Sequence, residues 1–306
     1  MSLITRVRRL FSQPEAAGTI GVSIKNHDLD YCALGQQQTV CNSQLVVDGQ
    51  YHQVIEKLSQ KIANNSQCNL VLCASQNHIV QIDKPQVPEA EVNSAVKWQI
   101  KDLVSIAPED MIVDYFDGPK LAGGLEKINV VCADKNMLSQ YITPLIEQGL
   151  SVDTITIEEF AFASLLPPQN EAKLLVCKQP GEGVLLLIVK NGDLYFHRRI
   201  RGLEQVELKS QEELDLSVID SLSLEIQRST DYFERQLKQA PIRSIEVLLP
   251  MEHEAFVARR LSENTDVTVN IFTMPEGFSE YRQFAACVGA IQLMAAGRKH
   301  HAKIIN

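Results

Sequence analysis

The chain has no long hydrophobic run. Among its 306 residues the longest uninterrupted apolar stretch is 184–189, which ends at Lys190. A membrane-spanning helix needs about 20 mostly apolar residues, so none is predicted. Residues 1–12 also lack the apolar core of a secretory signal. With 45% apolar and 22% charged residues, the composition fits a globular protein of about two domains, which we expect in the cytosol.

Basic residues are scarce except near the two ends of the chain. Residues 1–12 and 298–306 each hold three Lys or Arg residues and no acid. The body between them carries 23 basic and 38 acidic side chains, a net charge of −15 within the −9 of the whole chain. Phosphate contacts dominate nucleic-acid binding, so this balance argues against a nucleic-acid partner.

The basic segment 1–17 has apolar residues at helical spacing, with arginines on the flanks of that face. This pattern predicts a short amphipathic helix. Arg6, Arg8 and Arg9 are its candidate contacts with anionic lipid or with a membrane partner, and docking on the protein's own domain is an equal alternative. The basic tail 298–306 is a second candidate for peripheral membrane contact.

Metal-site and catalytic motifs are missing. The seven cysteines form no CxxC pair, and the nearest two, Cys68 and Cys73, would point to opposite faces of one strand. No metal site is expected, and buried free thiols are favoured over disulfides because most cysteines lie in apolar runs. The sequence contains no GxSxG, HExxH, Walker A or strand-following GxGxxG pattern, so no catalytic residue is predicted.

The sequence does contain one order of elements twice. From residue 18, three short strands precede a helix and then alternating strands and helices. The pattern restarts at residue 168, where Asn191-Gly192 is a strong hairpin signal between the second and third strands. The expected strands are 18–25, 29–34, 38–47, 69–74, 78–81, 111–116, 127–133, 152–157, 173–178, 183–190, 193–199, 244–249 and 267–272, and the expected helices are 50–64, 88–104, 138–148, 216–239, 254–261 and 281–296.

We therefore predict an α/β protein of two similar domains. The first spans residues 18–167, with a small insert at about 76–133, and the second spans 168–297. The segments 1–17 and 298–306 lie outside both domains.

Three segments resemble a known family. AVKWQIKDLVSIAPEDMIVDYF (95–116) resembles the helix, proline, acidic residue and Asp-Tyr-Phe strand of PilM-type pilus assembly proteins. LEIQRSTDYFE (224–234) resembles their long helix, and 143–162, with TPLI and GLSVD, resembles their link into the second domain. The match is closest to members serving mannose-sensitive haemagglutinin (MSHA) type IV pili. The resemblance implies the actin-like ATPase (ribonuclease H-like) fold.

The resemblance also implies a nucleotide site, whose residues are altered here. In actin-like ATPases, each of two hairpins supplies an Asp and a nearby Gly for Mg²⁺ and phosphate. The first hairpin of this chain has Ser23 and Lys25 at those places, followed by Asn26, and the second has Cys177 and Gln179. No glycine pair stands at 249–252, where adenosine would pack.

Without those carboxylates, a Mg²⁺ site is not expected. The resemblance thus implies a pseudo-ATPase with a degenerate site and without ATP as a cofactor. Lys25 is expected to be a solvated turn lysine, and Gly181 and Gly183 turn glycines, with anion binding as the alternative for each.

Trp98, the only tryptophan, and Lys101 form the candidate partner site. Trp98 lies beside the apolar stripe of helix 88–104, where a core position is favoured and an interface anchor is the alternative. In PilM-type proteins, a cytosolic segment of a PilN-type inner-membrane protein binds the first domain beside the insert. The resemblance implies a similar groove here.

The sequence thus predicts a non-enzymatic cytosolic scaffold of type IV pilus biogenesis, recruited to the inner membrane by a PilN-like protein and linked to the pilus assembly ATPase. One alternative is an active nucleotide switch in pilus or type II secretion assembly, with Asp28 or Asp220 replacing the lost acids. A second is a small-molecule kinase, which needs a general-base carboxylate in the cleft. A third is a cell-division scaffold of the same fold.

Overall fold

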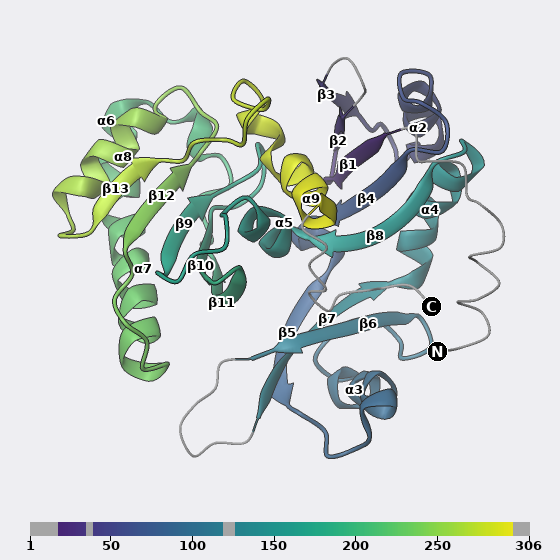
Figure 1. Cartoon of the computed structure of the whole chain (residues 1–306), viewed down its shortest axis with the longest axis horizontal. Coiled ribbons are helices and arrows are strands. Elements are labelled where there is room, and N and C mark those ends of the chain that lie inside the picture. The colour runs from purple at the N-terminus through teal and green to yellow at the C-terminus, as the bar shows by residue number, and fades with distance from the viewer. Residues whose placement is uncertain (1–17, 35–38, 119–125, 296–306) are drawn as a thin grey trace.

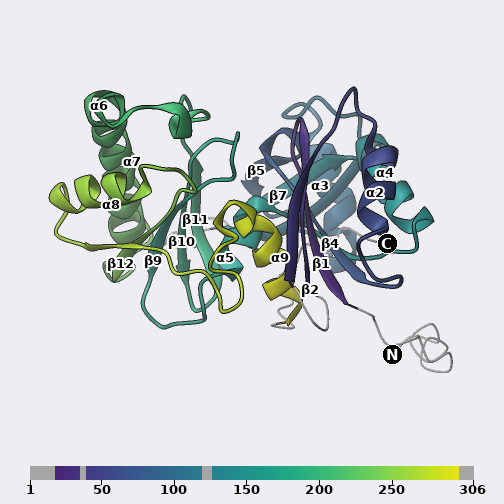
Figure 2. The same ribbon diagram turned by 90° about the horizontal axis from the view of Figure 1, so that it is seen from above.

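The computed structural model describes residues 18–34, 39–118 and 126–295. They form two halves, each built on a five-stranded sheet, and a smaller three-stranded sheet beside the first half (Figure 1). Helices α5 (Glu158–Ser164) and α9 (Ala285–Ala295) lie side by side between the two halves (Figure 2). No helix in these ranges is both long and apolar enough to cross a membrane.

The first sheet has the strand order β3-β2-β1-β4-β8. Its first three strands are an antiparallel meander, and β4 and β8 add to it in parallel. Helices α2 and α4 cover one face, where Tyr51 and Tyr141 meet edge to face at 4.6 Å. The elements are β1 (Thr19–Ile24), β2 (Asp28–Leu34), β3 (Thr39–Leu45), α2 (Tyr51–Ser59), β4 (Gln67–Leu72), α4 (Lys135–Glu147) and β8 (Ser151–Ile157).

The second sheet repeats this order as β11-β10-β9-β12-β13. The predicted Asn191-Gly192 hairpin is confirmed, since both residues have the positive φ that such a turn needs. The helix expected at 216–239 begins earlier, after the Ser210 cap, and contains two π-helical segments. The elements are β9 (Lys173–Cys177), β10 (Leu185–Lys190), β11 (Asp193–Arg199), α6 (Gln211–Glu213), π-helix Leu214–Val218, α7 (Ile219–Asp231), π-helix Tyr232–Gln236, β12 (Ser244–Leu248), α8 (Glu254–Glu263) and β13 (Thr268–Ile271).

The insert sheet is antiparallel, in the order β5-β7-β6. Helix α3 packs Val92, Val96 and Ile100 against it, which closes a small separate core. The elements are β5 (His78–Asp83), α3 (Val92–Ile100), β6 (Met111–Asp117) and β7 (Lys127–Asp134), and 3₁₀ turns lie at Ala74–Gln76, Glu89–Glu91, Val206–Leu208 and Arg282–Phe284.

Helix α9 joins the two halves by close backbone contact. A Cβ at Gly21 of β1 would lie 2.0 Å from the Cys287 carbonyl oxygen, and a Cβ at Gly289 would lie 1.8 Å from that of Ala161 in α5. Only glycine permits both contacts. Although the sequence assigns α9 to the second domain, it packs against β1 and β4 of the first sheet. The division at residue 168 stays a prediction.

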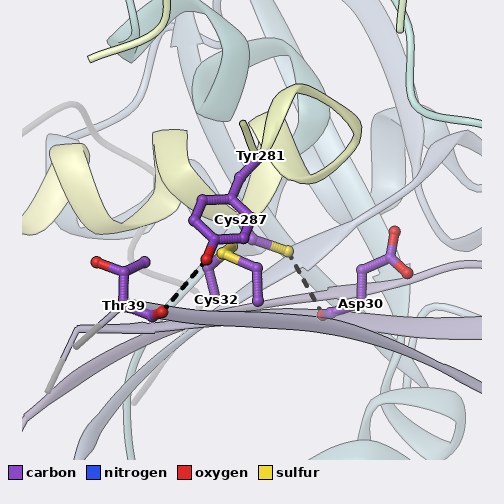
Figure 3. The surroundings of a disulfide bond; sticks show 6 residues. Asp30, Cys32, Thr39, Tyr281 and Cys287 are labelled. Atoms are coloured by element: carbon purple, nitrogen blue, oxygen red, sulfur yellow. Dashed lines mark hydrogen bonds between the residues drawn. A yellow bond between two sulfur atoms is a disulfide. The ribbon is translucent and has the colours of Figure 1, made fainter. Parts of the chain in front are cut away.

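The preference for free thiols is wrong for one cysteine pair. Cys32 and Cys41 form a disulfide between β2 and β3, with their Cα atoms 4.1 Å apart (Figure 3). The two residues are nine apart in sequence but directly opposite in the hairpin register, where side chains meet. The other five cysteines are buried and free, among them Cys287, which donates to the Asp30 carbonyl beside the disulfide.

Candidate functional site

The two hairpins that the resemblance assigns to nucleotide binding touch each other directly. Ser23, near the end of β1, donates its hydroxyl proton to Oε1 of Gln179, which follows β9, at 2.8 Å. Both side chains are buried. The structure therefore brings together two of the predicted site residues from opposite halves of the protein.

This contact continues into a buried ionic network. Gln179 donates from Nε2 to Glu158 Oε1 at 2.5 Å. Arg199, on β11, donates to Glu158 Oε2 at 2.6 Å and to Glu159 Oε1 at 3.3 Å. Ser23, Gln179, Glu158 and Arg199 thus form one hydrogen-bonded chain across the interface, which we call the Ser23 network. The sequence analysis missed Glu158 and Arg199, although two consecutive glutamates directly after a buried strand were a signal.

Glu158 titrates far from its usual range. Burial raises its pKa from the usual 4.5 to about 7; the nearby Arg199 lowers it, and the neighbouring Glu159 raises it. Its side chain is only 1% exposed. A proton can therefore enter or leave this network near neutral pH.

Lys25 is not a solvated turn lysine, as the sequence analysis favoured. Its side chain is 7% exposed, and its Nζ lies 2.8 Å from Asp30 Oδ2 and 3.9 Å from Asp28 Oδ2. The spacing pattern could not show that Asp30, on the next strand, faces it. Asn26 accepts a hydrogen bond from the Ser75 hydroxyl at 2.7 Å.

The second hairpin has a cysteine, Cys177, where actin-like ATPases have an Asp. Burial raises the pKa of the Cys177 thiol well above its usual value, and the thiol contacts the Leu185 carbonyl at 3.7 Å. Gly181 has a positive φ, and its N–H donates to Glu207 Oε1 at 2.9 Å. Gly183 accepts a bond from Arg199. A carboxylate thus already binds one of the N–H groups that a phosphate would need.

The backbone at the expected adenosine position also forms a hydrogen bond within the chain. The Leu249 N–H, where the adenosine-binding glycines would lie, donates to Glu254 Oε1 at 2.7 Å. In the residues described, no group of three or more His, Cys, Asp or Glu side chains is placed to hold a metal ion.

Trp98 is not a core residue. It is 66% exposed on α3, while Val96 and Ile100 face the insert sheet. The ammonium of Lys101 lies 5.9 Å from the centre of its ring, within cation–π range. The core interpretation is therefore wrong, and the role of Trp98 and Lys101 in partner binding stays a prediction. Arg6, Arg8, Arg9 and the tail 298–306 lie outside the described residues.

Comparison with known proteins relates the chain to solved structures only. No protein-family model matches the sequence, and no curated protein matches it. A chain of the PilM-PilN type IV pilus biogenesis complex superposes with a TM-score of 0.64 at 16% identity, over 91% of this chain and 99% of that one.

Two further structures are more distant. The cytoplasmic domain of EpsL, an inner-membrane component of the Vibrio cholerae type II secretion system, gives a TM-score of 0.48 at 14% identity over 81% and 94% of the two chains. A Bacteroides thetaiotaomicron protein with actin-like ATPase fold and unknown function gives 0.45 at 11% over 88% and 93%. The chain has the actin-like ATPase fold, which it shares with the superposed chain of the PilM-PilN complex.

Proposed function

We propose that the protein is a scaffold of type IV pilus assembly that binds a PilN-like inner-membrane protein on the cytoplasmic side. The observation that carries this proposal is the superposition on nearly the whole of a PilM-PilN chain. The three sequence segments that resemble PilM-type proteins support the same function. Their resemblance is closest to members serving the MSHA pilus, in which this chain would take the place of MshI and connect to the assembly ATPase.

We also propose that the protein is a pseudo-ATPase, because the residues present do not fit a Mg-nucleotide. The Ser23–Gln179 hydrogen bond joins the two hairpins, and Glu207 binds the Gly181 N–H. The three cations nearby are each paired, Lys25 with Asp30, Lys178 with Glu207 and Arg199 with Glu158. No cationic side chain of this set is left for a phosphate.

Calorimetry with the full chain tests the pseudo-ATPase proposal. We expect no binding of MgATP tighter than about 1 mM. Micromolar affinity that requires Mg²⁺ would establish the active-switch alternative instead. Its candidate acids are poorly placed, since Asp220 is exposed on α7 and Asp28 lies beside Lys25.

Trp98 and Lys101 supply the test of the scaffold function. We expect the full chain to co-precipitate a PilN-type membrane protein, and W98A/K101A to weaken this binding about tenfold or more, as loss of a Trp anchor does. L208A is the matched control, because Leu208 is 76% exposed on the other half. Capture of a division protein in place of the pilus protein would overturn the proposed function. Normal binding of the pilus protein by W98A/K101A would overturn only the assignment of the binding site to Trp98 and Lys101.

A further inference from the structure

Strand β3 is the outermost strand of the first sheet, so one of its backbone edges has no neighbouring strand in the described residues (Figure 1). The other strands that end a sheet there are protected from pairing with a second chain. β5, β6, β8 and β11 carry charged side chains, and β13 has only four residues. Short edges and edge charges are common means of preventing strand addition. Strand β3 has neither protection, since its seven residues, TVCNSQL, include no charged side chain.

The register of the β2–β3 hairpin shows which backbone groups of β3 face the open edge. Cys41 lies opposite Cys32, with their Cα atoms 4.1 Å apart. This short spacing is that of a non-hydrogen-bonded pair, in which the N–H and C=O of each residue point away from the other strand. Because this orientation alternates along a strand, Thr39, Cys41, Ser43 and Leu45 present their backbone groups to the open edge.

Few of these outward backbone groups are bound within the described residues. The Thr39 carbonyl accepts from the Tyr281 hydroxyl at 3.5 Å, which caps one end of the edge (Figure 3). The Ser43 carbonyl accepts from the Gln44 side chain at 3.0 Å, and a carbonyl oxygen has a second lone pair. The outward N–H groups donate to no other element that the structure describes. The uncapped part of the edge is therefore centred on Ser43.

The side chains along this edge are uncharged, and several apolar ones are exposed. Leu45 is 66% exposed, Val40 is 37% exposed, and Val47, just after the strand, is 53% exposed. Between them lie the half-buried amides of Asn42 and Gln44. An added strand would cover this apolar surface while it pairs with the open backbone groups.

We propose that two copies of this chain pair antiparallel through β3, which joins their first sheets into one continuous sheet. A two-fold axis at Ser43 pairs every uncapped outward residue, because Ser43 then faces itself and Cys41 faces Leu45 of the partner subunit. On the opposite face of the sheet, Asn42 lies beside Gln44 of the partner subunit, and amides both donate and accept hydrogen bonds. The strand is thus complementary to a reversed copy of itself.

The absence of charge on β3 favours a second copy over a charged partner segment. A basic or acidic segment would find no counter-charge on this strand, whereas a second β3 needs none. Self-pairing of a charged strand about its own centre would place like charges near each other, which is unfavourable, and TVCNSQL avoids this. The dimer goes beyond the scaffold function and does not depend on the identity of the pilus partner.

Sedimentation equilibrium of the full chain between about 1 and 500 µM tests the proposal. We expect the mass of the monomer, 34.2 kDa, at the lowest concentration and twice that mass at the highest. S43K should raise the dissociation constant about tenfold or more, because two ammonium groups then face each other across the axis. S43T keeps the edge uncharged and should dimerise like the native chain. S151K is the matched control, because Ser151 is exposed on β8, at the opposite edge of the same sheet.

Amide hydrogen exchange at the two extreme concentrations locates the contact. The N–H groups of Cys41, Ser43 and Leu45 should exchange about tenfold more slowly at the higher concentration. Those of Asn42 and Gln44 point to β2 and should not change, so they are the internal reference. This measurement uses the native chain and therefore tests the proposal even if S43K does not fold.

Three results would overturn the proposal. The first is the mass of a monomer at every concentration. The second is a dimer whose dissociation constant is unchanged in folded S43K, because the contact would then lie elsewhere. The third is slow exchange of the Cys41, Ser43 and Leu45 amides to the same degree at both concentrations, which would assign the edge to a segment of the same chain.

Discussion

Replacement of Glu158 by glutamine should remove a pH dependence of stability. The folded-state pKa of Glu158, about 7, lies above the usual 4.5, so folding favours the protonated form. Its contribution to stability is therefore complete below about pH 4.5 and is lost as the pH rises through about 7. Between pH 5 and pH 8 the loss is about 2.5 kcal/mol, since each pKa unit corresponds to about 1.4 kcal/mol.

The glutamine variant keeps the shape of the network. Its amide oxygen can accept from Arg199, and its amide nitrogen can donate to Gln179 if the Gln179 amide turns over. Ser23 then accepts in place of donating, as a hydroxyl can. E158Q should therefore fold, with a charge at residue 159 still facing Arg199.

The assay is urea unfolding followed by circular dichroism at several pH values and constant ionic strength. The native chain should lose about 2.5 kcal/mol more than E158Q between pH 5 and pH 8. E212Q, at an exposed glutamate, is the control and should follow the native chain. Parallel curves for the native chain and E158Q would refute the reasoning, because they would mean that Glu158 does not bind its proton at neutral pH.

Two more predictions follow from backbone contacts and the disulfide. G289A should lower the free energy of unfolding by several kcal/mol, because its Cβ would meet a carbonyl oxygen at 1.8 Å, and a melting temperature equal to that of the native chain would contradict this. C32S/C41S should lose about 2.5 kcal/mol, as expected for a cross-link nine residues apart, and dithiothreitol should destabilise the native chain by the same amount while leaving the variant unchanged.

Most elements were predictable from the sequence. The strands have alternating or continuous apolar residues, and the turns contain residues that favour turn conformations, such as Asn191-Gly192. Helix α5 was missed because all of it except Ser164 is buried, so it has no polar face from which a helical period can be recognised. The π-helical segments were missed because the spacing of apolar residues in an α-helix does not reveal the extra residue that a π-helical turn contains.

The candidate site was predictable only in part. The resemblance identified Ser23 and Gln179, and the structure places them in contact. Arg199 lies 41 residues from Glu158, on β11 of the second sheet, whereas Glu158 begins helix α5, so no local pattern links them. Lys25 and Trp98 were assigned to the wrong environments for the same reason, since the burial of one and the exposure of the other depend on how distant elements pack.

The place of α9 has a consequence for biosynthesis. Asn69 on β4 donates to the carbonyl of Ala290, a residue 221 positions later, and Cys287 contacts Asp30 across 257 positions. During translation, the face of the first sheet that α9 covers therefore stays exposed until α9 has left the ribosome. We expect nascent chains that stop before residue 285 to bind chaperones through that face, because exposed apolar surface is what chaperones recognise.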